Sequence, residues 1–162
     1  MKYNSAMNFE HLIQINDPEN PLVQPLTRDQ LWAGLLHRVE NPVPFLPGLE
    51  SCTILERQAN ELLRELDFGP ATIQDRVTLV ETHWVRFDII PSEVHAGGSL
   101  TITIEEPEPG FLFLRFAYRT TLASNPNSED RAYIEYVKSA YHQSDVDCVR
   151  LIRTLAAEGF PQ

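Results

Sequence analysis

Two residues of opposite charge, Arg64 and Asp75, stand within apolar runs of the sequence and are the first candidates for chemistry. Arg64 lies between Leu62 and Leu66 at a spacing of two, and Asp75 has the same setting in the next run. Residues spaced by two share one face of a strand, so both charges are expected on the apolar face of a sheet. A buried charge is costly unless it pairs or reaches water. The two are therefore predicted to pair across neighbouring strands inside a pocket, while a purely structural pair at a sheet edge and a shifted register remain open.

His11 and three aromatic residues extend this set. His11 falls on the apolar face of the first expected strand, where an imidazole could carry a proton or orient a polar group of a ligand; a histidine satisfied within the core fits the same position. Tyr118 lies on the apolar face of the last expected strand and Tyr141 on the apolar stripe of the C-terminal helix, and a buried tyrosine hydroxyl needs a partner. Both positions suit a ligand pocket and an ordinary core role equally well. Trp32 follows the stripe of the first helix, where packing is the alternative to ligand contact.

Motifs for metals, nucleotides and covalent catalysis are missing from the sequence. The histidines, at positions 11, 37, 83, 95 and 142, lack metal-ligand spacing, and neither HExxH nor GxSxG occurs. No glycine-rich phosphate-binding loop is present. Cys52 and Cys148 stand far apart without CxxC spacing, so reduced and buried thiols are expected rather than a disulfide or zinc site. We expect no cofactor and no metal.

Composition and charge exclude several classes of partner. The 162 residues are 43% hydrophobic and 22% charged, which is typical of a globular chain that forms one domain over residues 1–162. A formal net charge of −10 without a basic patch disfavours nucleic acids and anionic lipid surfaces. No apolar stretch is long enough to cross a bilayer, and the N-terminal residues lack the pattern of a signal peptide. No membrane insertion and a cytoplasmic location are therefore expected.

The N-terminal third of the sequence is predicted to form a strand followed by a helix. Hydrophobic and polar residues alternate over 9–15, which predicts a strand. Thr27 and Gln30 have capping-box spacing at the start of a helix whose apolar stripe ends before Asn41. The proline-rich segment 42–48 is expected to form a short turn or a single helical turn, because each proline ring removes a donor.

Six further strands are predicted between residues 51 and 122. The segments are CTILERQ, ELLRELDF, TIQDRVTLV, HWVRFDII, SLTITIEE and FLFLRFAYRTTL. The breaks between them are short, which allows only antiparallel neighbours. Residues 128–161 then carry apolar residues at helical spacing and close with Gly159 and Pro161, which predicts one long helix or two in tandem. Ser144 and Asp147 repeat the capping-box spacing, so a kink or break is expected at residues 143–145.

This order of elements predicts an α+β fold (β-α-α-β6-α) in which a seven-stranded, curved antiparallel sheet wraps around the long C-terminal helix. Four segments connect it to a known family: LTRDQLWAGLLHRVENP, FLPGLESCTILER, LLRELDFG and YVKSAYHQSDVDCVRLIRTLAAEGF. Over nearly its whole length the chain resembles the START-like or Bet v 1-like (SRPBCC) superfamily of helix-grip proteins, and within it the AtaL-like branch. The resemblance implies a cavity for a hydrophobic ligand, with the turn around Phe45 at its mouth, and only some members of the superfamily are catalysts.

The favoured function is the binding of a small, largely hydrophobic molecule between the sheet and the C-terminal helix, because no catalytic constellation is evident. The alternative is a cyclase- or aromatase-like enzyme acting on a polyketide-like substrate, with Arg64, Asp75, His11 or a tyrosine as acid, base or oxyanion partner. A third possibility is an interaction domain that forms a homodimer through Phe111 and Phe113. The residues expected to line the ligand site are His11, Trp32, Phe45, Arg64, Leu66, Asp75, Val77, Phe87, Ile102, Phe116, Tyr118, Val137 and Tyr141.

Overall fold

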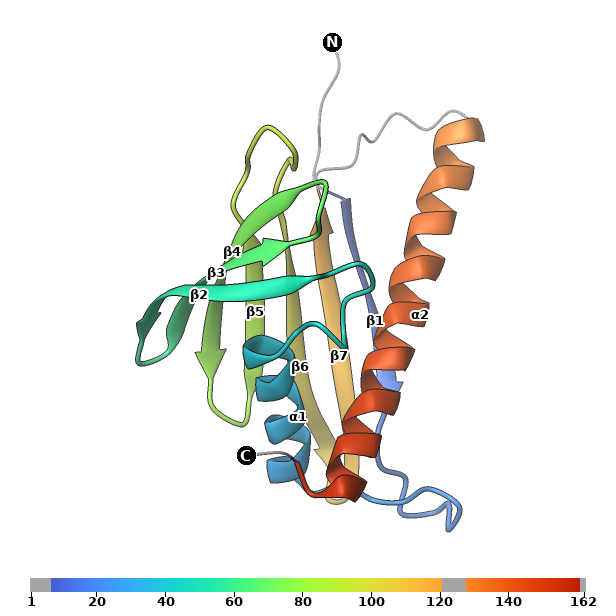
Figure 1. The fold of residues 1–162 in the computed structure, drawn as a ribbon. Coiled ribbons are helices and arrows are strands. Elements are labelled where there is room, and N and C mark those ends of the chain that lie inside the picture. Colours follow the sequence, from blue (N-terminus) through green and yellow to red (C-terminus); the bar gives the residue numbers. More distant parts are fainter. Residues whose placement is uncertain (1–6, 121–127, 161–162) are drawn as a thin grey trace.

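The computed structural model describes the backbone of residues 7–120 and 128–160, and the side chains of residues 8–120 and 135–160. Two helices and seven strands follow one another in the predicted order, with a turn in place of the second, short α element (Figure 1). The strands are β1 (Met7–Gln14), β2 (Ser51–Gln58), β3 (Glu61–Asp67), β4 (Thr72–Val80), β5 (Trp84–Ile89), β6 (Gly98–Glu108) and β7 (Phe111–Thr120). The helices are α1 (Arg28–Glu40) and α2 (Ser128–Glu158).

All seven strands form one antiparallel sheet in the order β1-β7-β6-β5-β4-β3-β2. The first strand therefore pairs with the last, and β2 to β7 form the predicted meander. Register shifts between Ile54 and Glu56 and between Glu105 and Glu108 interrupt the ladder. Such bulges bend and twist a sheet locally. The sheet curves around the helices, as the helix-grip fold requires (Figure 1).

Helix α1 begins where the sequence predicts. The Thr27 side chain accepts a hydrogen bond from the Gln30 backbone N–H, and the Gln30 side chain accepts one from the Thr27 N–H, which completes the capping box. The proline-rich segment after α1 was expected to form either a short turn or a single helical turn, and it forms turns. The backbone N–H of Phe45 donates to the Pro42 carbonyl at 2.8 Å, but no helical ladder follows, because the prolines cannot donate.

Helix α2 runs without a break from Ser128 to Glu158, so the break expected at residues 143–145 is wrong. The side chains that suggested a cap are engaged elsewhere. Asp147 accepts hydrogen bonds from Gln143 and Arg150 on its own helix, and Ser144 faces a pocket. Neither competes with the helical backbone, so the ladder continues.

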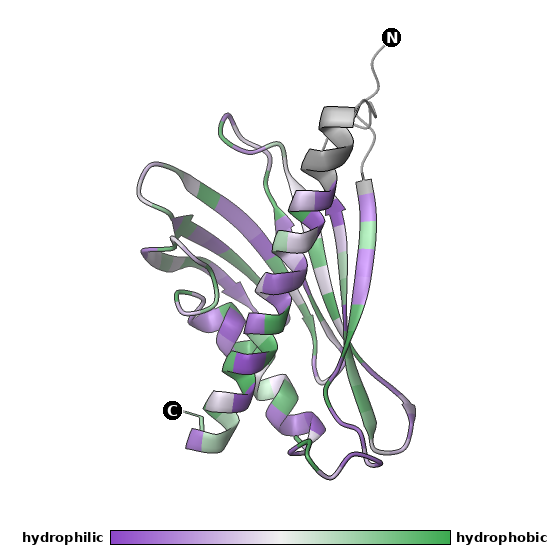
Figure 2. Cartoon of the chain, turned by 90° about the vertical axis from the view of Figure 1, so that its right-hand side faces the viewer, coloured by the Kyte–Doolittle hydropathy of each residue, from purple (hydrophilic) through white to green (hydrophobic). Residues whose placement is uncertain are grey.

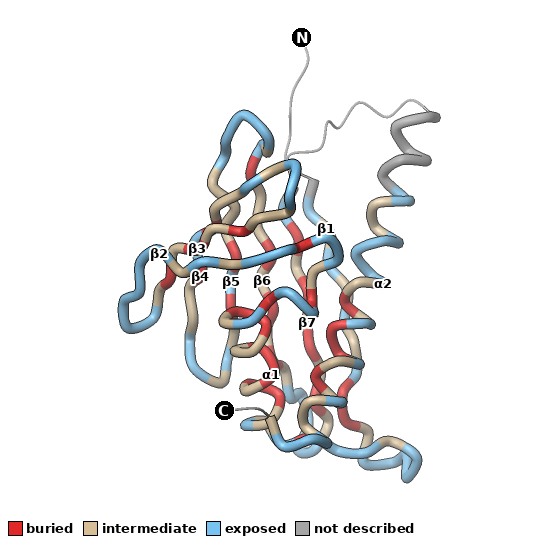
Figure 3. Tube along the Cα trace, in the orientation of Figure 1, coloured by how far each residue is buried: buried red, intermediate tan, exposed pale blue. Residues whose placement is uncertain are grey.

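The hydrophobic core fills one end of the molecule. Buried residues gather where α1 and the C-terminal half of α2 meet the sheet, while residues 135–143 of α2 are more exposed (Figure 3). Hydropathy follows the same division, with hydrophobic residues concentrated on the later turns of α2 (Figure 2). The helices touch closely there, since a Cβ built on Gly34 would lie 2.5 Å from Ile152. Within the described part of the chain, neither helix has the length and apolarity needed to cross a bilayer.

Candidate functional site

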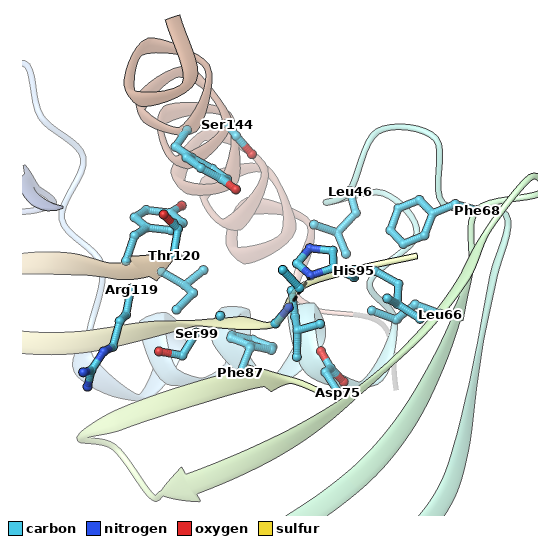
Figure 4. A pocket seen from close by; sticks show the side chains of 18 of the residues that line it. Leu46, Leu66, Phe68, Asp75, Phe87, His95, Ser99, Arg119, Thr120 and Ser144 are labelled. Carbon is cyan, nitrogen blue, oxygen red and sulfur yellow. Dashed lines mark hydrogen bonds between the residues drawn. The ribbon is translucent and has the colours of Figure 1, made fainter. Parts of the chain in front are cut away.

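A cavity of about 520 Å³ occupies the other end, between the sheet and the N-terminal half of α2 (Figure 4). Strands β3 to β7 form its floor, the 90–97 loop and the turn after α1 form its rim, and Val137, Tyr141 and Ser144 of α2 close it from above. The exposed area of the wall is mainly apolar, although nearly half of the lining residues carry a polar side chain. Both the volume and this composition are typical of small-molecule sites.

Arg64 and Asp75 form a buried, bidentate ion pair on the cavity wall. They are direct neighbours in the β3–β4 register. Arg64 Nε donates to Asp75 Oδ1 at 2.8 Å, and Nη2 donates to Oδ2 at 2.6 Å. Only 2% of Arg64 and 3% of Asp75 is exposed. The pairing expected from the sequence is therefore present in the structure.

A third contact gives this pair a structural role. Arg64 Nη1 donates to the carbonyl of Val39 at 2.9 Å and to that of Arg38 at 3.4 Å. These carbonyls belong to the last turn of α1, whose carbonyl groups lack partners within the helix. Arg64 thus joins the end of α1 to the sheet, and each of its three guanidinium nitrogens already has a partner.

A second polar cluster joins α2 to the strands. The Tyr118 hydroxyl donates to the Asp145 carboxylate at 2.7 Å. His11 Nε2 lies 2.7 Å from Asp145 Oδ2 at ion-pair distance, although its geometry is not that of a hydrogen bond. Asp145 is fully buried, whereas Tyr118 lines the cavity and also stacks on Tyr141, with ring centroids 4.4 Å apart. Tyr118 therefore contacts both the buried Asp145 carboxylate and the cavity.

Burial dominates the electrostatics of this cluster. It raises the pKa of Asp145 to about 7, although the hydrogen bond from Tyr118 and the charge of Arg38 act in the opposite direction. Burial, and then the charge of Asp145, raises the pKa of Tyr118 well above its ordinary value. Burial, and then His142, lowers the pKa of His11. Asp145 is thus a carboxyl group that changes charge near neutral pH.

Arg38 of α1 also lines the cavity and is only 7% exposed. Its Nε and Nη1 atoms are buried and have no hydrogen-bond partner among the described residues. The guanidinium carbon lies 5.5 Å from the centroid of the Phe87 ring. Arg38 is therefore a buried cation with free donors at a cavity wall.

Seven of the thirteen residues predicted to contact a ligand line the cavity. They are Arg64, Leu66, Asp75, Phe87, Tyr118, Val137 and Tyr141. Ligand contact by these residues stays a prediction.

The structure places the other six elsewhere. Trp32, Val77, Ile102 and Phe116 belong to the hydrophobic core, because α1 and the later turns of α2 fill that end of the sheet. His11 contacts Asp145 beside the cavity. Phe45 lines a separate, smaller depression against the later turns of α2, and the turn around it reaches the cavity through Leu46.

Arg38 and Asp145 were missed although the sequence carries a signal for both. Arg38 follows Leu31 and Leu35 at helical spacing, and Asp145 lies four residues after Tyr141 on the stripe that continues to Cys148. A charged residue within an apolar helical stripe was the sign. His95 of the 90–97 loop also lines the cavity, and its loop position gave no periodicity to reveal it.

The described side chains contain no group of three or more potential metal ligands. Both cysteines are unpaired; Cys148 is buried as expected, whereas Cys52 is only half-buried. Burial raises the pKa of both thiols, which disfavours the nucleophilic thiolate. Phe111 and Phe113, the expected dimer face, are half-buried because β7 lies between β1 and β6.

The sequence matches the model of a known protein family. The model of the AtaL family, described as acetylaranotin biosynthesis cluster protein L, matches residues 13–159. The chain belongs to the AtaL family. No curated protein matches the sequence significantly.

Several solved structures share the fold of this AtaL-family chain. The Zhui aromatase/cyclase from Streptomyces sp. R1128 has a TM-score of 0.67 at 15% identity, with 96% of this chain and 99% of that chain covered. The di-domain aromatase/cyclase StfQ from the steffimycin pathway has a TM-score of 0.68 at 14% identity, over 96% of this chain and 53% of its own. Ara h 8.0201 has a TM-score of 0.63 at 12% identity, over 93% and 99%. At such identities the likeness shows the helix-grip fold alone.

Proposed function

We propose that this protein binds a small, largely apolar molecule in the cavity between the sheet and the N-terminal half of α2. The cavity itself carries the proposal, since it holds about 520 Å³ at the end of the sheet that the core leaves unfilled. A folded protein gains stability by filling apolar space, so a cavity of this size is best explained by an occupant. The family and fold support a hydrophobic-binding role without naming the ligand.

Native mass spectrometry of freshly purified protein, with identification of any co-purified molecule after denaturation, is the direct test. We expect a stoichiometric adduct of predominantly apolar character. A panel of aromatic, lipid and polyketide-like compounds should also raise the Tm, because a ligand that binds only the folded state stabilises it. A clean ligand-free mass together with no Tm shift across the panel would contradict the proposal.

A blocking substitution ties binding to this cavity. Val137→Trp adds an indole to the half-buried position of α2 that lines the cavity and should abolish ligand binding. Val80→Trp makes the same change at a 41% exposed position outside the cavity and should bind as the wild type does. Equal binding by both variants would place the ligand elsewhere.

A second candidate is acid–base catalysis on a polyketide-like substrate, and the Tyr118–Asp145 contact favours it over catalysis by Arg64 and Asp75. A tyrosine hydroxyl at the cavity wall, backed by a carboxyl group that titrates near neutral pH, can pass a proton to or from a carbonyl compound. Arg64 and Asp75 are instead occupied by each other. The aromatase/cyclases share only the fold.

Incubation with linear poly-β-ketone thioesters tests this second candidate. Tyr118→Phe and Asp145→Asn should abolish cyclised product while the substrate still binds. Unchanged product formation in both variants would exclude the cluster from chemistry.

A further inference from the structure

The charge on Arg38 is unusual within the cavity wall. Removing a guanidinium from water costs several kcal/mol unless hydrogen bonds and an opposite charge replace the lost hydration. Arg38 is more than nine-tenths buried, and two of its nitrogens lack any partner among the described residues. The folded protein therefore carries an unpaired donor group at the surface where the proposed ligand would lie.

The neighbouring guanidinium of Arg64, by contrast, has a hydrogen-bond partner for each of its nitrogens. Both guanidinium carbons lie over the Phe87 ring, at 5.1 Å for Arg64 and 5.5 Å for Arg38. Arg64 is neutralised by Asp75 and also holds two carbonyls of α1. Arg38 has no equivalent ion pair in the described part of the chain. Arg64 thus has a structural role, whereas the guanidinium of Arg38 has no ion-pair partner among the described residues.

Asp145 does not supply the missing partner. It is near enough for the charge of Arg38 to influence it, but no hydrogen bond or ion pair joins the two side chains. Its oxygens instead contact the Tyr118 hydroxyl and His11. Arg38 therefore keeps two buried donor nitrogens that no described residue binds, in a protein whose net charge is −10.

We propose that Arg38 binds an anionic oxygen group of the ligand, so that the natural ligand is an apolar organic acid whose charged end lies at Arg38 and whose body fills the cavity. This inference rests on the proposed binding function. A guanidinium suits this role because its planar donors match the two oxygens of a carboxylate, and the low dielectric of a buried site strengthens the contact. The apolar lining contributes affinity for the ligand body, and Arg38 selects its charged end.

Two fluorescent probes isolate the charge. Anilinonaphthalene sulfonate and N-phenylnaphthylamine share the same aromatic body, but only the first carries an anionic group. Arg38→Met keeps the length of the side chain and removes the donors, and because the removed charge was unpaired, the variant should remain folded. Arg38→Lys keeps a positive charge without the planar fork. Arg86→Gln, at an exposed position of β5 outside the cavity, is the matched control for loss of one positive charge.

We expect Arg38→Met to lower the affinity for the sulfonate probe at least about tenfold, since a hydrogen bond to a charged group contributes roughly 1.5–3 kcal/mol. The neutral probe should bind Arg38→Met within about twofold of its wild-type affinity, and both probes should bind Arg86→Gln equally well. Arg38→Lys should retain more sulfonate affinity than Arg38→Met. An unchanged affinity ratio of the two probes in Arg38→Met would overturn the role of Arg38 while leaving the binding function intact. Failure of the neutral probe to bind the wild-type protein would instead contradict the binding function, and this inference with it.

Discussion

Removing the guanidinium of Arg64 should destabilise the protein far more than removing the whole ion pair. Arg64→Met deletes the charge but keeps an apolar side chain of similar length. Asp75 then remains 3% exposed without its partner, and the Val39 carbonyl at the end of α1 loses its donor. Both losses occur in the same buried region.

The magnitude follows from the cost of an uncompensated buried charge. Breaking a buried ion pair by removing one partner costs about 3–5 kcal/mol. For a chain of this size that corresponds to a fall in Tm of roughly 6–20 °C. Replacing both members by apolar residues avoids the stranded charge, so the double variant Arg64→Met/Asp75→Leu should approach the wild type, apart from about 1 kcal/mol for the lost bond to α1.

Chemical denaturation of the wild type, both single variants and the double variant forms a complete double-mutant cycle. We expect a coupling free energy of at least about 2 kcal/mol between Arg64 and Asp75, as is typical of directly bonded groups. Arg76→Met, combined with Glu61→Leu, is a matched control because this ion pair spans the same two strands on the exposed face. It should show a coupling below about 1 kcal/mol. Additive effects at Arg64 and Asp75 would refute the reasoning.

Three further changes test other parts of the structure. The pKa of the Asp145 carboxyl is ordinarily 3.8 and is about 7 in the folded protein. The protonated carboxyl therefore contributes its full share to the free energy of unfolding below pH 3.8, and this contribution is lost as pH rises through 7. The shift corresponds to about 4 kcal/mol; Asp145→Asn should remove this pH dependence from the free energy of unfolding, and an unchanged pH profile would contradict it. Gly34→Ala should cost about 1–3 kcal/mol because its Cβ meets Ile152; the added cost should vanish in an Ile152→Ala background, and its persistence there would disprove the clash. Thr27→Ala should cost about 0.5–2 kcal/mol through loss of the capping box, measured by thermal unfolding, with a neutral result counting against that cap.

Much of the fold was predictable because the relevant signals are local. Alternating residues marked the strands, the short breaks between them required antiparallel pairing, and Thr27 with Gln30 fixed the start of α1. The pairing of Arg64 with Asp75 followed from two charges on one face of adjacent strands. The break expected in α2 was wrong because capping-box spacing is only a local pattern: Asp147 accepts hydrogen bonds from side chains of its own helix, and Ser144 faces the cavity.

The sequence by itself determined which face of each strand is apolar and which residues interrupt that face with charge. Only the tertiary structure decided which of these positions face the cavity. Phe116 and Tyr118 share one face of β7 and both belong to the hydrophobic core, yet of the two only Tyr118 also lines the cavity. The physical reason is that periodicity reports a direction around a strand, whereas burial depends on what packs against it along its length. Here α1 and the later turns of α2 fill one end of the sheet and leave the other end open to a ligand.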